Sequence, residues 1–127
     1  MPGASKKLIL IIDDDEDIAN ALSRILEREG YATARAEDGE KGLEAVKARK
    51  PDLVLLDFMM PVKDGFDAAR EIRRLTPAPI VALTAYGKDV CRLHGLGAEG
   101  DEVHLAGFVE KPFEPNVLIE QVARAFG

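Results

Sequence analysis

Apolar runs alternate with stretches of helical spacing along the whole chain, and this alternation restricts the possible folds more than any other feature. A continuous apolar run such as KLILII at 7–12 is typical of a strand that is covered on both faces. Strands are expected at 7–12, 31–36, 52–56, 80–83 and 107–109, and helices at 16–29, 38–49, 64–75, 88–97 and 115–126. Five such alternations predict a doubly wound α/β fold, in which helices cover both faces of a five-stranded parallel sheet.

Length and charge narrow the class of protein further. The 127 residues predict one domain, 1–127, in which residues 1–6 form a flexible N-terminal tail. The net charge of −6 and the lack of a basic run argue against direct binding of nucleic acid. No apolar run is long enough to span a membrane, and the lysines near the N-terminus precede no signal-peptide core. A cytoplasmic location is therefore expected, with no membrane partner.

Polar residues follow the expected strands at the places where a parallel α/β sheet binds its ligands. Such sheets bind ligands beyond the carboxyl ends of their strands. Asp13 and Asp14 follow the first strand, Asp57 the third, Thr84 the fourth and Lys111 the fifth. We therefore expect these carboxylates, the hydroxyl and the ammonium group to meet at one edge of the sheet.

The residue types at this edge suit a magnesium ion and a phosphoryl group. Carboxylates without a neighbouring His or Cys favour a hard cation such as Mg²⁺, which accepts a few carboxylates and keeps several waters. Asp57 stands alone after a buried strand, where its carboxylate can attack an electrophile. Beside Mg²⁺ the fitting electrophile is a phosphoryl group, whose oxygens Lys111 and Thr84 can contact.

The acidic stretch after the first strand also has a purely structural interpretation. Acidic residues before a helix cap its N-terminus and complement the helix dipole. This role is expected for the DED sequence at 15–17. For Asp13 and Asp14 taken alone, capping and metal binding explain the pattern about equally well. The presence of Asp57 and Lys111 favours metal binding for that pair.

Four motifs, taken together and in this order, resemble the signatures of response-regulator receiver domains: IIDDDEDI, LLDFMMPVKDG, VALTAYG and FVEKPF. The resemblance implies a flavodoxin-like fold with strand order 2-1-3-4-5 and five helices. It also implies a role in a bacterial-type two-component phosphorelay, in which a histidine kinase or a histidine phosphotransfer protein donates the phosphoryl group. Such a domain phosphorylates itself and slowly loses the group, but it is not an enzyme that acts on a separate substrate.

The resemblance assigns the acceptor and the metal ligands by position. Asp57 corresponds to the phosphoacceptor of the family. Asp13 and Asp14 correspond to the acidic pair that holds Mg²⁺ together with Asp57, and the backbone carbonyl of Met59 is expected to complete the set. The Lys111–Pro112 peptide is expected to be cis, which costs an X–Pro bond only about 0.5–1 kcal/mol.

The resemblance also assigns the residues that relay and time the signal. Thr84 and Phe108 match the hydroxyl and the aromatic residue of the family's switch, and Lys111 matches its lysine. Met59 and Tyr86 occupy two positions that tune the lifetime of the phosphoryl group. Because both side chains are bulky and neither is an acid or an amide that would orient water, slow autodephosphorylation is expected.

Two other functions fit parts of the pattern less well. A phosphatase of the haloacid-dehalogenase type also uses an aspartate nucleophile and Mg²⁺, but it has a second aspartate where Met59 stands. A receiver-like adaptor that works without phosphorylation normally lacks part of the acidic pocket. The segment 87–107 is longer than the family pattern, and it lies where most receivers contact partners. The output is expected to be a protein partner or a fused effector absent from this chain, which is then a stand-alone or an excised receiver.

Overall fold

The computed structural model describes residues 6–58, 65–84 and 105–127, which form a parallel sheet of five strands in the order β2-β1-β3-β4-β5. The strands are β1 (Leu8–Ile12), β2 (Ala32–Ala36), β3 (Leu53–Asp57), β4 (Ile80–Thr84) and β5 (Gly107–Glu110). The helices are α1 (Glu16–Arg28), α2 (Gly39–Arg49), α3 (Gly65–Leu75) and α5 (Pro115–Phe126). The predicted fold class and strand order are confirmed, and four of the five expected helices are described.

Some predictions concern parts of the chain outside the described residues. The helix expected at 88–97 lies there, as does almost all of the expected tail at 1–6. Met59 and Tyr86 lie there too. Among the described helices, none combines the length and the apolar character that a membrane crossing requires.

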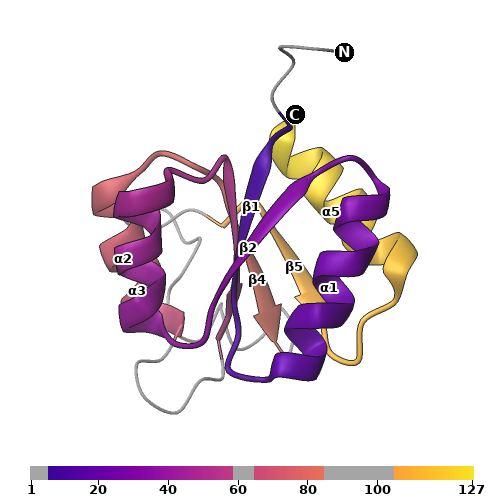
Figure 1. Ribbon diagram of the computed structural model, residues 1–127, viewed down its shortest axis with the longest axis horizontal. Helices are drawn as coiled ribbons and strands as arrows, with labels where there is room; N and C mark the ends of the chain where they lie inside the picture. Colours follow the sequence, from indigo (N-terminus) through magenta and orange to yellow (C-terminus); the bar gives the residue numbers. More distant parts are fainter. Residues whose placement is uncertain (1–5, 59–64, 85–104) are drawn as a thin grey trace.

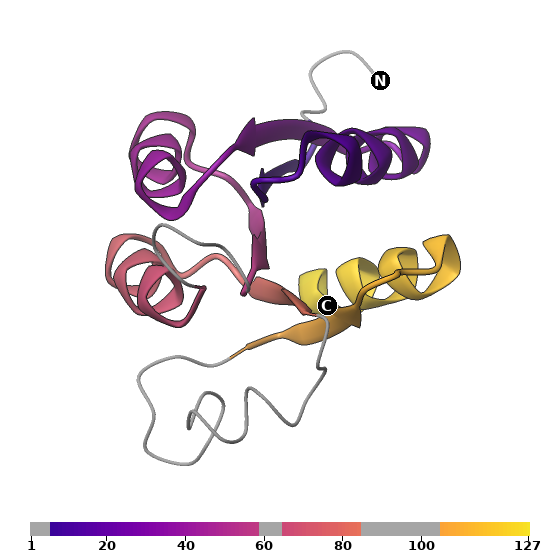
Figure 2. The ribbon, with the colours of Figure 1, turned by 90° about the horizontal axis from the view of Figure 1, so that it is seen from below.

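Helices cover the sheet on both faces, as the apolar runs predicted. Helices α2 and α3 lie on one side of the strands, and α1 and α5 lie on the other (Figures 1 and 2). Successive residues of β1 serve the two layers in turn, since side chains alternate along a strand. Leu10 and Ile12 pack in the core beneath α2 and α3, whereas Ile9 and Ile11 pack in the core beneath α1 and α5. Such two-sided burial explains why this strand is apolar throughout.

The first helix begins with the capping that the sequence predicted. The Asp15 carboxylate accepts hydrogen bonds from the backbone N–H groups of Asp17 and Ile18, so it is the N-cap of α1. Gly30, directly after the end of this helix, has a φ of 95° that favours glycine. The capping role of Asp15 separates it from Asp13 and Asp14, which precede the helix.

A glycine lets α2 approach the end of β1 closely. A Cβ atom on Gly42 would lie 2.5 Å from Cδ1 of Ile12 and 3.0 Å from its Cγ1. A glycine in the middle of a helix normally costs about 1 kcal/mol relative to alanine. Here the missing side chain makes room for Ile12, the last residue before the acidic stretch.

Candidate functional site

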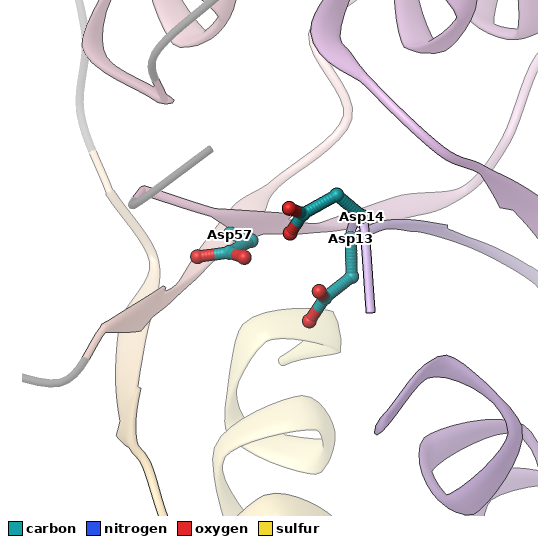
Figure 3. A group of neighbouring side chains, drawn as sticks. All are labelled: Asp13, Asp14 and Asp57. Atoms are coloured by element: carbon teal, nitrogen blue, oxygen red, sulfur yellow. The ribbon is translucent and has the colours of Figure 1, made fainter. Parts of the chain in front are cut away.

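Three carboxylates meet at the carboxyl ends of β1 and β3. The two strands are neighbours, and Ile12 pairs with Leu56, so Asp13 and Asp57 follow at adjacent positions. One carboxylate oxygen from each of Asp13, Asp14 and Asp57 lies within 4.8 Å of the other two (Figure 3). Asp13 and Asp57 are buried, whereas Asp14 is exposed. The acidic pocket, meaning these three aspartates, therefore opens to solvent through Asp14.

Lys111 enters the acidic pocket from the end of β5. Its Nζ donates a hydrogen bond to Oδ2 of Asp57 at 3.1 Å and lies 3.1 Å from Oδ2 of Asp13. Its backbone N–H donates to the carbonyl of Thr84, which fixes the start of the loop that follows β5. One ammonium group thus bridges the two buried carboxylates, although they lie far from it in sequence.

Burial and charge act against each other in this pocket. Burial and the neighbouring Asp57 charge together raise the pKa of Asp13 to about 6, against the hydrogen bond from Asp15 N–H and the Lys111 charge, which lower it. Burial lowers the pKa of Lys111, but Asp13 and Asp57 outweigh it, so the pKa of this ammonium group is raised overall. Lys111 therefore stays protonated. The crowding of negative charge appears as the raised pKa of Asp13.

The donor set fits a small divalent cation. Three carboxylates against one ammonium leave a formal charge of −2 when all are ionised. Oδ2 of Asp13 is buried and, apart from its ion pair with Lys111, has no hydrogen-bond partner among the described residues. A hard cation would satisfy this oxygen and offset the charge, and Mg²⁺ is the ion that few-carboxylate sites of this kind bind.

The structure places the other predicted site residues around this edge. Thr84 is fully buried at the end of β4, the strand between β3 and β5. Phe108 is half-buried in β5 and packs against the core beneath α2 and α3. The Lys111–Pro112 peptide is cis, as expected. The roles assigned to Met59 and Tyr86 fall outside the described residues.

One residue at this site was not predicted from the sequence. Arg35 in β2 donates from Nε and from Nη2 to the backbone carbonyl of Asp13, at 3.3 and 3.1 Å. The available signal was a long basic side chain in a strand of small residues, ATARA, which leads to the same edge of the sheet. That signal is weak, because the partner of Arg35 is a backbone atom that no residue pattern displays.

Comparison with known proteins identifies the family. The response regulator receiver domain matches residues 9–123 of the chain. The DNA-binding response regulator MtrA of Mycolicibacterium smegmatis is 40% identical over 117 residues, which are 92% of this chain and 49% of that protein. The transcriptional regulatory protein AfsQ1 of Streptomyces coelicolor is 40% identical over 110 residues, 87% of this chain and 47% of that protein. The chain thus spans about half the length of these curated relatives.

Two solved structures share the fold over nearly their whole length. The chemotaxis protein CheY4 of Vibrio cholerae superposes with a TM-score of 0.84 at 26% identity, and the match covers 95% of this chain and 99% of that one. A putative response regulator from Chloroflexus aurantiacus superposes with a TM-score of 0.82 at 30% identity, covering 96% and 98% of the two chains. The architecture of the described residues is therefore that of a receiver fold.

Proposed function

Because this chain belongs to the response regulator receiver family, we propose that it accepts a phosphoryl group on Asp57 from a histidine kinase or a histidine phosphotransfer protein. Receivers are signalling modules of two-component systems, and their only catalysis is that of their own phosphorylation chemistry. The observation that carries the proposal is the Lys111 bridge between Asp57 and Asp13 beside the exposed Asp14. This arrangement puts a buried carboxylate, a cation and a set of metal-type ligands within one pocket.

The transfer itself requires little covalent chemistry from the protein. The Asp57 carboxylate forms an O–P bond while the N–P bond of a phosphohistidine breaks, and the released imidazole takes up a proton from water. Lys111, which is held within 3.1 Å of Asp57, supplies positive charge to the phosphoryl oxygens. Burial of Asp57 keeps competing water away from its carboxylate, since its residue surface is only 2% exposed.

Asp13, Asp14 and Asp57 are the residues proposed to hold Mg²⁺, with the backbone carbonyl of Met59 as a further ligand. When bound, the ion would neutralise negative charge on the transferred group. The chain's own contribution is to hold the carboxylates together against their repulsion. Lys111 does this from one side, and the N–H of Asp15 fixes Oδ1 of Asp13 at 2.9 Å.

Thr84 and Phe108 are proposed to carry the signal away from Asp57. Thr84 ends β4 beside the acceptor strand, and its hydroxyl can donate to a phosphoryl oxygen. Phe108 lies in the next strand, opposite Ala82. A change in the Thr84 position then alters the space available to the Phe108 ring and biases the surface around β5. The receiving partner is proposed to be a protein or an effector domain that recognises this surface.

Intact-mass measurement with a small phosphodonor tests the proposed function. Incubation with Mg²⁺ and acetyl phosphate is expected to add the mass of one phosphoryl group to the wild-type protein. The Asp57→Asn variant should gain no mass, and excess EDTA should abolish the gain on the wild type. A wild-type protein that gains no mass would contradict the proposal and favour an adaptor that works without phosphorylation.

A further inference from the structure

We propose that Arg35 is a positioning residue that orients the peptide between Asp13 and Asp14, and with it the Asp14 side chain, for cation binding. The inference deepens the proposed function and rests on it in one respect, namely that the acidic pocket binds a divalent cation. It concerns a residue of the edge strand β2 that lies outside the acidic pocket itself.

Residues 35 and 36 of β2 form hydrogen bonds with both polar groups of the Asp13 backbone, its N–H and its carbonyl. The N–H of Asp13 donates to the carbonyl of Ala36 at 3.1 Å, which extends the pairing of β1 with β2 by one residue. The carbonyl of Asp13 points to the Arg35 guanidinium and accepts from Nε at 3.3 Å and from Nη2 at 3.1 Å. Two donors from one rigid planar group define the direction of this carbonyl more tightly than one donor would.

The carbonyl that Arg35 holds belongs to the peptide that joins the two acidic residues. The carbonyl of Asp13 and the N–H of Asp14 lie in one rigid plane, with a carboxylate-bearing Cα at each end. The side chain of Asp13 is fixed independently, by the N–H of Asp15 and by Lys111. Within the described part of the chain, no hydrogen bond holds the exposed Asp14 carboxylate, so the peptide plane sets where this side chain leaves the backbone. A tilt of this peptide would therefore move Asp14 relative to Asp13 and Asp57.

The charge of Arg35 and its hydrogen bonds have opposite effects on cation affinity. A guanidinium near the acidic pocket repels a divalent cation, so loss of the charge alone would tighten binding, weakly, because Arg35 is exposed and screened by salt. Loss of the two hydrogen bonds frees the peptide and weakens binding. The sign of the change thus separates positioning from simple electrostatics.

Titration calorimetry with Mg²⁺ tests the proposal on the intact chain. Residues that orient metal ligands typically contribute about tenfold or more to affinity, so Arg35→Met should raise the Mg²⁺ dissociation constant about tenfold. Arg35→Lys keeps the charge and one donor, and it should fall between wild type and Arg35→Met. Arg70→Met is the matched control, because Arg70 is a surface arginine of α3 whose ion pair is with Asp67. Its dissociation constant should equal that of the wild type.

A measurement without metal shows whether the peptide itself responds. The backbone carbonyl ¹³C resonance of Asp13 should shift in Arg35→Met and shift less in Arg35→Lys, while urea unfolding verifies that both variants are folded. An unchanged or lower dissociation constant in Arg35→Met would overturn the inference, whether or not the resonance moves. Absence of Mg²⁺ binding by the wild type would instead overturn the metal site of the proposed function, so the two failures are distinguishable.

Discussion

Lys111 is the residue on which the charge balance of the acidic pocket depends. It hydrogen-bonds Asp57 and ion-pairs with Asp13, and both carboxylates are buried. Lys111→Met should lower the free energy of unfolding by about 2 kcal/mol near neutral pH without Mg²⁺, because a charged hydrogen bond is lost. Urea unfolding followed by circular dichroism measures this value. Lys41→Met is the control. Lys41 and Glu37 form an exposed ion pair, so this substitution should lower the free energy of unfolding far less.

The raised pKa of Asp13 predicts how stability changes with pH. Burial and the nearby Asp57 charge raise this pKa from its ordinary value of 3.8 to about 6, so between these values the folded state binds more protons than the unfolded state. Stability from this group is complete below the lower pKa and is lost as pH rises through the upper one. Without Mg²⁺, Asp13→Asn should therefore gain stability relative to wild type as pH rises from about 4 to about 7.

In the difference between the unfolding free energies of Asp13→Asn and wild type, the contributions of most other titrating groups cancel. Asparagine keeps the oxygen that accepts from the N–H of Asp15, so the turn after β1 is preserved. Unfolding free energies of both proteins across this pH range give the difference directly. A difference that shrinks with rising pH would mean that the folded state prefers the charged form of Asp13, contrary to the burial argument.

Residue types at strand ends made the acidic pair, Asp57 and Lys111 predictable from sequence. Asp13 and Asp57 follow apolar runs whose strands lie side by side, so the pairing needed only the topology. The raised pKa of Asp13 was not predictable, since it depends on burial that only the packed structure defines. Arg35 was missed for a related reason, because a side chain that serves a backbone carbonyl leaves no complementary residue in the sequence.

At the level of elements, the contact of α2 with β1 offers a sharp test of packing. Gly42→Ala gains about 1 kcal/mol of helix propensity but brings a methyl group against Ile12. Ile12→Val removes the atom nearest to that methyl group, at a cost of about 1 kcal/mol of its own. In a double-mutant cycle, Gly42→Ala should be more favourable in the Ile12→Val background by about 1 kcal/mol.

The cycle has a control within the same helix. Ala48 is exposed on α2, so Ala48→Gly reports helix propensity without the contact to Ile12. Its effect on the free energy of unfolding should be the same in both backgrounds. Zero coupling between Gly42→Ala and Ile12→Val would show that the Ile12 side chain turns away from the added methyl group at no cost.

Most element boundaries were predicted to within one or two residues, since local chemistry marks them. Asp15 caps α1, and Pro115 is the first residue of α5, where its missing N–H costs nothing. The end of β4 was predicted one residue early, because Thr84 is polar although fully buried. Periodicity could not show that Gly42 permits a close approach, because this depends on which residue of β1 faces it.

At the level of the whole molecule, the site exists only because the strands of the sheet lie in one particular order. Asp13 and Asp57 come from the adjacent strands β1 and β3, whereas Lys111 reaches them from β5, beyond β4. Alternating strands and helices predicted the parallel sheet, and the resemblance supplied the strand order. Neither of these could predict that a single ammonium group bridges Asp13 and Asp57, because that depends on the direction of the Lys111 side chain.

Cation binding should therefore stabilise the whole fold, and more strongly at neutral than at acidic pH. Above its dissociation constant, each tenfold rise in Mg²⁺ concentration should add about 1.4 kcal/mol to the free energy of unfolding. A proton competes with the ion for Asp13, whose pKa is about 6. Urea unfolding with and without Mg²⁺ at about pH 5 and about pH 7.5 should show the larger gain at the higher pH.

Two variants separate this linkage from a general salt effect. Asp14→Asn removes one proposed ligand from the exposed mouth of the acidic pocket and should reduce the gain at both pH values. Asp67→Asn removes an exposed carboxylate of α3 that lies outside the pocket, and it should leave the gain as in the wild type. Equal losses in both variants would show that Mg²⁺ acts on surface charge in general. If only Asp14→Asn loses part of the stability gained on adding Mg²⁺, ion binding and folding are coupled at the aspartates of this sheet edge.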